Sequence, residues 1–338
     1  MFISVVMSVY NTEKYVKQAV DSILLQTHKN FEFIIINDGS TDNTRKILDT
    51  IEDNRVNIIH LEKNHGVAYA RNLGVQAAKG EWIAVQDADD ISMPSRLEKQ
   101  AEFIESHPHV IAVGSKIECI SGKPAVSRRV TNGISNFHNS LLTNDDLLKE
   151  RFRSCPLSHG SCIFSKKAFE TAGRYDSKYR LIQDYDLWLR MFNIGSIEIV
   201  PEVLYLYRVH QGSLTNHSRN AFCIEMNQIS MKYICKFYFG QKVKKPIFIV
   251  FGPKQHCKIF RDHVVRYGKF KIHQYVSFKH YKDYLDSSYQ KFRNETVDGI
   301  IVLDPHKGPE CKETLSYLES KGMNYNQNLF SLYNILEL

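Results

Sequence analysis

The sequence predicts an α/β fold with a mostly parallel central sheet and a smaller C-terminal α/β domain. Short apolar runs typical of buried strands alternate with segments of helical period through the first hundred residues. That alternation favours parallel strands joined by crossover helices. Beyond residues 240–245 the alternation starts again, and 338 residues exceed the usual length of one domain. We therefore expect two domains, residues 1–240 and residues 246–338.

Strands in the first domain are expected where a short apolar run ends in polar residues, and helices where apolar residues recur at steps of three and four. The first strand, for example, ends at Val9, just before the polar pair Asn11-Thr12. Ser40 or Thr41 is expected to cap the second helix. In order, the expected elements are strand 3–9, a helix from residue 13, strand 31–36, a helix that carries Ile47, Leu48 and Ile51, strand 56–61, helix 66–78, strand 82–85, helix 94–106, strand 110–119, strand 161–165, helix 184–193 and strand 203–209.

Residues 121–143 are polar and irregular in pattern, so we expect a surface excursion there. The first domain is expected to end in a long amphipathic helix. Its apolar face is predicted to pack in the core, with a membrane-surface or dimer contact as the alternative. That face carries Phe222, Met226, Ile229, Tyr233 and Phe237. The second domain is expected to contain strand 247–251, a helix to residue 267, helix 281–291, strand 299–303 and helix 310–321.

The composition is that of a soluble globular protein, with 43% hydrophobic and 24% charged residues. No apolar run is long enough to cross a bilayer, and the first residues carry no basic leader of a secretory signal. The seven cysteines are scattered and form no Cys-x-x-Cys pair, which favours reduced thiols over a zinc site or a disulfide framework. We therefore expect a cytoplasmic protein.

The net charge of +7 is unevenly distributed, because ten basic residues between 242 and 279 are opposed there only by Asp262. Basic faces attract anionic lipid or nucleic acid, but most are simply solvated surfaces. No nucleic-acid motif accompanies the segment, so we expect no nucleic-acid partner. A solvated face is favoured, with peripheral attachment to the inner membrane face as the alternative. The ten are Lys242, Lys244, Lys245, Lys254, Lys258, Arg261, Arg266, Lys269, Lys271 and Lys279.

An acidic run follows the strand that begins at Trp82: Asp87, Asp89 and Asp90 stand within four residues. Carboxylates this close repel one another unless a cation lies among them. A strand end is also where open α/β sheets bind ligands. One interpretation is a divalent ion, Mg²⁺ or Mn²⁺, held between the acids and the phosphates of a nucleotide. The other is an acidic turn that caps the helix near Pro94.

Further polar residues lie at the ends of other expected strands. Ser8 and Tyr10 close the first strand, Asp38 closes the second, and Arg71 lies in the glycine-flanked stretch 66–74. A carboxylate can accept the imino N–H of a uracil, a tyrosine can stack on a base, and an arginine can contact base or phosphate. Taken singly, Asp38 is as consistent with a tight turn, and Arg71 with a helix-surface charge.

Six motifs in order resemble the family 2 glycosyltransferases, inverting enzymes with the GT-A fold, over about residues 1–215. By position, the resemblance implies that the nucleotide base lies near Ser8, Tyr10, Asp38 and Arg71. It implies ribose contact at Asp87 and, at Asp89, the metal that bridges the diphosphate. The motifs are Val6-Met7-Ser8-Val9-Tyr10-Asn11, Asn37-Asp38-Gly39-Ser40-Thr41-Asp42, Gly66-x4-Arg71-Asn72-x-Gly74, Asp87-Ala88-Asp89-Asp90, Gln183-Asp184-Tyr185-Asp186-Leu187-Trp188 and Tyr207-Arg208-Val209-His210.

The resemblance also implies that Asp184 is the general base that deprotonates the acceptor hydroxyl. The alternative is that Asp184 is simply an acid at a helix N-terminus, where the helix dipole stabilises it, and both interpretations can be true together. Gln183 departs from the glutamate usual in the family, which removes a charge beside that base. His210 is implied to contact the diphosphate or metal and His159 the acceptor; for His210, a surface or core histidine is an equal alternative.

The resemblance implies a metal-dependent inverting glycosyltransferase, hexosyl- or N-acetylhexosaminyl-specific, that uses Mn²⁺ or Mg²⁺. It would move a sugar from a nucleotide-sugar, with UDP favoured, to a hydroxyl of a glycan or lipid-linked acceptor in polysaccharide biosynthesis. The alternatives are a nucleotidyltransferase, for which no Gly-rich loop with a basic residue ends the first strand, and a non-catalytic sugar-nucleotide-binding protein, which has no use for Asp184. After Gly252 the second domain lacks Gly-x-Gly-x-x-Gly, which favours an interaction or homo-oligomer module.

Overall fold

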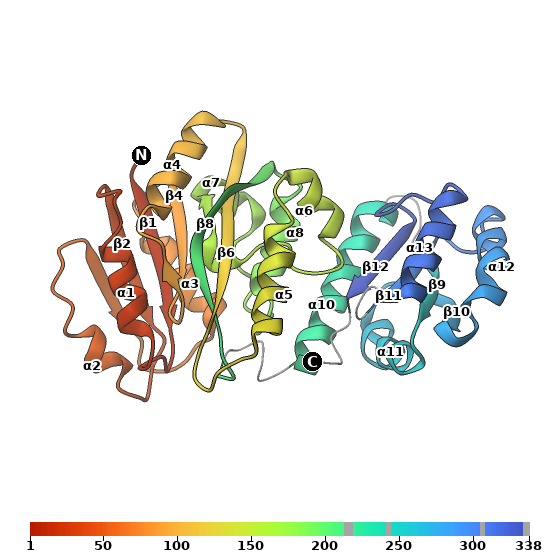
Figure 1. Cartoon of the computed structure of the whole chain (residues 1–338), viewed down its shortest axis with the longest axis horizontal. Coiled ribbons are helices and arrows are strands. Elements are labelled where there is room, and N and C mark those ends of the chain that lie inside the picture. Colours follow the sequence, from red (N-terminus) through yellow and green to blue (C-terminus); the bar gives the residue numbers. More distant parts are fainter. Residues whose placement is uncertain (213–218, 241–244, 305–307, 334–338) are drawn as a thin grey trace. The chain divides into compact units, whose positions relative to one another are not determined.

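The computed structural model describes residues 1–212, 219–240, 245–304 and 308–333, which form two compact units (Figure 1). The first comprises Met1–Leu148 with Pro156–His217, and the second comprises Lys149–Cys155 with Ser218–Leu338. Helix α10 (Arg219–Ile234) belongs to the second unit, whereas the sequence prediction assigned it to the first domain. The expected boundary at 240–245 lies mostly outside the described residues, as do Lys242 and Lys244.

The first unit contains an eight-stranded sheet in the order β3-β2-β1-β4-β7-β6-β8-β5. Strands β3, β2, β1 and β4 run parallel, as do β6 and β8, so the predicted mostly parallel sheet is confirmed. In the register, Ser8 of β1 faces Asp87 of β4, and Val9 faces Asn37 of β2, so these three strands end at the same edge. The strands are β1 (Ile3–Val9), β2 (Phe31–Asn37), β3 (Val56–His60), β4 (Trp82–Asp87), β5 (Ile91–Ser92), β6 (Val110–Ser121), β7 (Ile163–Ser165) and β8 (Ser196–Val209).

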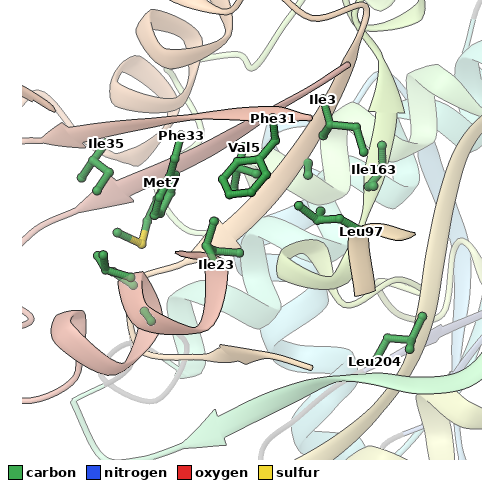
Figure 2. Packing of buried hydrophobic residues seen from close by; sticks show 14 of the residues in the cluster. Ile3, Val5, Met7, Ile23, Phe31, Phe33, Ile35, Leu97, Ile163 and Leu204 are labelled. Atoms are coloured by element: carbon green, nitrogen blue, oxygen red, sulfur yellow. The ribbon is translucent and has the colours of Figure 1, made fainter. Parts of the chain in front are cut away.

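Alternate residues of the central strands face opposite layers of helices, as the two-residue period of a strand requires. Figure 2 shows Ile3, Val5 and Met7 of β1 packed with Ile23 of α1 (Val16–Leu24) and Leu97 of α4 (Arg96–Ser106). The intervening residues face α3 (Val67–Ala77), where a side-chain carbon at Gly74 would meet Val6. The remaining helices are α2 (Thr44–Leu48), α5 (Arg128–Asn139), α6 (Asn144–Glu150), the 3-10 turn η1 (His159–Ser161), α7 (Lys166–Ala172) and α8 (Gln183–Met191).

Two local predictions for the first unit need correction. Residues 121–143 lie mostly at the surface, as expected, but they are not irregular, because they contain helix α5. This helix binds β6 through polar side chains: Asn139 both donates to and accepts from the backbone of Ile117, and Ser135 accepts from Cys119 N. Neither Ser40 nor Thr41 caps α2, because both bind Asn11 instead and Asn43 occupies the cap position.

The second unit is a four-stranded parallel sheet in the order β10-β9-β11-β12. Strands β10 and β12 were not predicted from the sequence, whereas β9 and β11 were. The strands are β9 (Ile247–Gly252), β10 (Lys271–Ser277), β11 (Gly299–Asp304) and β12 (Leu329–Tyr333). The helices are α10, the π-helical turn η2 (Cys235–Phe239), α11 (Lys254–Ile259), its π-helical continuation η3 (Phe260–Val264), the 3-10 turns η4 (Val265–Tyr267) and η5 (Phe278–His280), α12 (Tyr281–Arg293) and α13 (Pro309–Ser320). Across the described residues, no helix is long and apolar enough to cross a membrane.

Candidate active site

An ion pair joins helix α3 to the end of β4. Arg71 Nη2 donates to Asp87 Oδ1 over 2.6 Å, and the Arg71 side chain is only 8% exposed. Burial raises the pKa of the Asp87 carboxyl, and the Arg71 guanidinium opposes that rise. Because a buried charge is costly without a partner, each member of this pair depends on the other.

Asp38 fixes the start of the helix that carries Arg71. Its two carboxylate oxygens accept the backbone N–H groups of His65 and Gly66, each over 2.8 Å. Gly66 has φ 93°, a conformation that glycine adopts without strain, and α3 begins at the next residue. Each carboxylate oxygen has two lone-pair sites, so Asp38 retains capacity for a further donor such as a base N–H. Tyr10, which follows the neighbouring strand β1, is 45% exposed.

At the other end of the acidic run, Asp89 meets His210, which follows β8. Asp89 Oδ2 and His210 Nε2 lie 2.8 Å apart. Arg208 connects the two segments, since its backbone N–H donates to Asp90 Oδ1 and its Nε donates to the carbonyl of Asp89, both over 2.6 Å. Burial, together with Asp89 and Asp87, raises the pKa of Asp90 well above its usual value. Asp90 therefore holds β8 against the acidic turn.

The Asp89–His210 pair is the position at which a divalent ion is expected, and its geometry can be compared with what such an ion requires. Within the described part of the chain, no group of three or more His, Cys, Asp and Glu side chains is arranged to hold a metal. Mg²⁺ is commonly bound by one or two protein ligands, with water and substrate phosphates completing the shell. Ligands at right angles around an ion with bonds of about 2.1 Å stand about 3 Å apart. The 2.8 Å between Asp89 Oδ2 and His210 Nε2 fits that spacing.

Asp184 occupies the first turn of α8, and its Oδ1 accepts the backbone N–H of Tyr185 over 2.8 Å. Burial raises the pKa of the Asp184 carboxyl, the Arg71 guanidinium lowers it, and Asp87 raises it. Asp184 thus lies within electrostatic range of the Arg71–Asp87 pair, although it comes from a segment about 100 residues later. The preceding residue, Gln183, is 3% exposed, and its Oε1 has no hydrogen-bond partner among the described residues.

His159 is buried in an aromatic setting. Its Nε2 lies 2.8 Å from the hydroxyl of Tyr175, and its ring lies edge-on to Trp188 with 5.4 Å between centroids. Burial and the nearby Arg71 charge lower the pKa of His159 well below its usual value, so its imidazole is neutral at neutral pH. Its Nδ1 is buried without a hydrogen-bond partner among the described residues.

Comparison with known proteins identifies the family. The family model described as "Glycosyl transferase family 2" matches residues 4–173, about half of the chain. An uncharacterized glycosyltransferase from Haemophilus influenzae is 32% identical over 240 residues, which cover 68% of this chain and 73% of that protein. The chain belongs to glycosyl transferase family 2.

Solved structures show that this family 2 glycosyltransferase has a GT-A type fold. S. aureus TarS 1–349 aligns with TM-score 0.54 and 20% identity, over 70% of this chain and 66% of that one. The match covers 40% of the longer TarS chain, and TarS 1–349 also has a structure in complex with UDP-GlcNAc. The mannosyltransferase PcManGT from Pyrobaculum calidifontis, in complex with GDP-Man and Mn²⁺, aligns with TM-score 0.50 and 17% identity, over 96% of this chain and 76% of that one.

In this glycosyltransferase the structure brings together Ser8, Arg71, Asp87 and Asp184, with His159 beside Arg71, and separately joins Asp89 to His210. Tyr10 follows β1 and Asp38 follows the neighbouring strand β2. Among the described residues neither forms a hydrogen bond with Asp87, Asp89 or Asp90; Asp38 instead accepts from the backbone of His65 and Gly66. The roles expected of these residues stay predictions.

Sequence reasoning missed the residues that support Asp87. Tyr205 of β8 accepts the backbone N–H of Asp87 over 3.2 Å. Gly160 packs so closely on both that a side-chain carbon there would lie 2.1 Å from the Tyr205 hydroxyl and 2.7 Å from Asp87 Oδ2. The glycine after His159 was the available signal, since glycine is the residue that allows another group to approach the backbone closely. Nothing in the pattern of β8 marks Tyr205.

Proposed function

We propose that this glycosyltransferase moves a sugar from a UDP-sugar to a hydroxyl of a glycan or lipid-linked acceptor, with inversion and with a divalent ion. The observation that carries the proposal is that three segments meet at the Arg71–Asp87 ion pair. Asp184 interacts electrostatically with Arg71 and Asp87, and on the other side Asp89, two residues after Asp87, pairs with His210. The UDP-GlcNAc bound by TarS and the GDP-Man and Mn²⁺ bound by PcManGT support a nucleotide-sugar donor and a metal.

On the donor side, the residues at the strand ends would bind the nucleotide. Asp38 accepts the base N–H with its remaining lone pairs, and the exposed Tyr10 ring supplies a stacking surface. Ser8 lies near the base, and Asp87, its neighbour in the register of β1 and β4, contacts the ribose. Arg71, also expected near the base, holds Asp87 in position and favours its ionised form against the effect of burial.

Asp89 and His210 would hold Mn²⁺ or Mg²⁺. When bound, the ion acts as a Lewis acid that neutralises charge on the leaving diphosphate. The chain's own contribution is to keep the two ligand atoms 2.8 Å apart, which Arg208 does by attaching the end of β8 to Asp89 and Asp90.

On the acceptor side, Asp184 takes the proton of the attacking hydroxyl. The bond between acceptor oxygen and anomeric carbon forms as the bond from that carbon to the phosphate oxygen breaks, and UDP leaves with both electrons. A base must be ionised yet basic enough to accept a proton, so a pKa raised by burial and held down by Arg71 suits the role. His159, neutral and close to Arg71, is proposed to contact the acceptor.

The test compares Asp184→Asn with Asp145→Asn. Both acids stand in the first turn of a helix, but Asp145 is exposed on α6. With a panel of UDP-sugars and glycan acceptors, Asp184→Asn should bind UDP and Mn²⁺ normally by calorimetry and lose at least about a thousandfold in transfer rate. Asp145→Asn should transfer normally.

Near-normal turnover by Asp184→Asn would show that Asp184 is not the general base. Donor binding without turnover by the wild-type protein, across the panel, would favour the non-catalytic binding alternative. Full activity in excess chelator would exclude the ion at Asp89 and His210. We also propose that the protein is cytoplasmic, which cell fractionation tests. Residues 246–338 are proposed to act as an interaction or homo-oligomer module, which sedimentation equilibrium tests.

A further inference from the structure

The second unit carries a surface that the transfer reaction does not use. We define the basic face as the exposed cationic side chains of residues 245–280. Those residues carry eight basic and one acidic side chain, while the rest of the chain carries 36 basic and 36 acidic ones. The whole net charge of the protein therefore belongs to this one segment. The basic face consists of Lys245, Lys254, Lys258, Arg261, Arg266, Lys269, Lys271 and Lys279.

The fold directs these charges outward. Helix α11 and its continuation η3 bury Cys257, Phe260 and Val264, which leaves Lys254, Lys258 and the other cations of this segment on the solvent side. Among the strands that the structure describes, β10 lies at the edge of its sheet and pairs with β9 alone. The basic face thus extends from a helix surface to this edge strand.

The charge is polarised within the second unit. From residue 281 to residue 333, which includes α12 and α13, the chain carries six basic and eight acidic residues. Those two helices pack with each other, as in the ion pair of Lys282 with Glu313. A surface selected only for solubility mixes both signs, as this part does. The segment 245–280 does not.

A simpler account explains part of the basic face. Lysines on an edge strand prevent pairing with other chains, and that suffices for Lys271 on β10. It does not explain Lys254 and Lys258, because they lie on a helix, which offers no strand edge for another chain to pair with. A partner of opposite charge would account for them.

We propose that the basic face binds the anionic phospholipid headgroups of a bilayer surface. Six of its eight cations are lysines, compact charges that are attracted to an anionic surface without a defined geometry. Nucleic-acid binding would favour well-exposed aromatic rings between the cations, on which bases stack. Phe260 and Phe270 are buried, and Tyr275 and Phe278 are only partly exposed. This surface interaction is independent of the proposed transfer reaction.

The experiment is co-sedimentation of the full chain with vesicles, without any sugar donor. The protein should bind vesicles that contain phosphatidylglycerol and not vesicles of phosphatidylcholine alone. Raising the salt from about 0.1 M to 1 M shortens the Debye length from about 10 Å to about 3 Å and should release it. The triple variant Lys254→Gln/Lys258→Gln/Lys269→Gln should bind the anionic vesicles at least about tenfold more weakly.

The matched control is Lys282→Gln/Lys312→Gln/Lys321→Gln, the same change of charge on α12, α13 and the residue that follows α13. It should bind as the wild type does, and circular dichroism should show both triple variants folded. The proposal is overturned by equal binding to both kinds of vesicle, by equal losses in the two variants, or by a basic face that binds duplex DNA or RNA but no vesicle. Because no donor is present, these outcomes do not depend on the proposed function.

Discussion

The ring of Tyr15 lies 5.0 Å from the ring of His210, centroid to centroid, and the guanidinium carbon of Arg208 lies 4.7 Å from the centroid of the same tyrosine ring. Tyr15 precedes α1, almost 200 residues before its two partners. Its hydroxyl accepts the backbone N–H of Lys123 over 3.1 Å. One aromatic side chain therefore supports both residues that join the end of β8 to the acidic turn.

Tyr15→Leu should weaken metal binding without removing a ligand. Loss of the ring frees His210 to rotate away from Asp89, and residues that orient a ligand typically contribute tenfold or more to metal affinity. We expect the dissociation constant of Mn²⁺, measured by electron paramagnetic resonance in the presence of UDP, to rise about tenfold. Tyr15→Phe keeps the ring and loses only the contact with Lys123, so it should bind Mn²⁺ nearly as the wild type does. Equal affinities for all three proteins would show that Tyr15 does not position His210.

Gly160→Ala should damage both stability and donor binding. The added methyl group cannot fit between the Tyr205 hydroxyl and Asp87 Oδ2, so β8 or β4 must shift. We expect a loss of about 1 to 3 kcal/mol in the free energy of unfolding and weaker UDP binding. Both tryptophans, Trp82 and Trp188, lie in the first unit, so denaturant titration by fluorescence reports on that unit.

Gly133→Ala is the control for that substitution. Gly133 lies in helix α5, and a side-chain carbon there meets no atom within 4 Å. Alanine is favoured over glycine in a helix, so this variant should be unchanged or up to about 1 kcal/mol more stable. If Gly160→Ala also unfolds at the wild-type denaturant concentration, the close approach of Gly160 to Asp87 is not maintained in solution.

The sequence predicted the fold best where side-chain burial alone decides the structure. Strand β1 shows an apolar run that only a buried strand explains, and its predicted bounds agree with the structure. Helix α5 was missed although Val130, Ile134 and Phe137 recur at steps of four and three, because the arginines, asparagines and serines around them make the segment polar as a whole. Strand β10 escaped because an edge strand exposes polar residues such as Lys271 and His273.

For the candidate site, the motifs identified the polar residues but not what supports them. Asp87 and Asp89 are recognisable because carboxylates rarely cluster without a cation. Tyr15 supports the end of β8 from almost 200 residues away, and Tyr205 reaches Asp87 from about 120 residues away. A single tyrosine in a helix start or a strand resembles any other. Such contacts depend on tertiary packing, which no local pattern encodes.

Arg71→Gln should shift the pH dependence of the reaction upward. Asp184 must be ionised to accept a proton, so kcat falls as the pH drops through its pKa. The Arg71 charge lowers the pKa of Asp184 and so opposes the effect of burial. Removal of that charge should shift the acid limb of the kcat–pH profile to higher pH by about one unit. The measurement is kcat at saturating donor, which separates this effect from weaker donor binding. Arg45→Gln, an exposed arginine paired with Asp49, should leave the acid limb in place. An unshifted limb in Arg71→Gln would mean that Asp184 is not the group that titrates.

Acid should destabilise the first unit through His138 of α5. Burial lowers the pKa of His138 to about 4, against a usual 6.5. Above pH 6.5 the imidazole is neutral in both the folded and the unfolded chain, so it contributes no pH dependence there. Between pH 6.5 and pH 4 the unfolded chain takes up a proton that the folded chain does not, and up to about 3 kcal/mol of stability is lost over that window. Below pH 4 both states are protonated and the loss is complete.

His138→Gln isolates this effect, because glutamine can keep a hydrogen bond to the carbonyl of Pro156 but has no proton to gain. Denaturant titrations followed by tryptophan fluorescence at pH 7 and pH 4.5 should show a smaller acid-induced loss in His138→Gln than in the wild type. His109→Gln, an exposed histidine in the same unit, should lose as much stability as the wild type. If all three proteins lose the same free energy of unfolding, His138 takes up its proton as readily in the folded chain as in the unfolded one, and the acid sensitivity lies elsewhere.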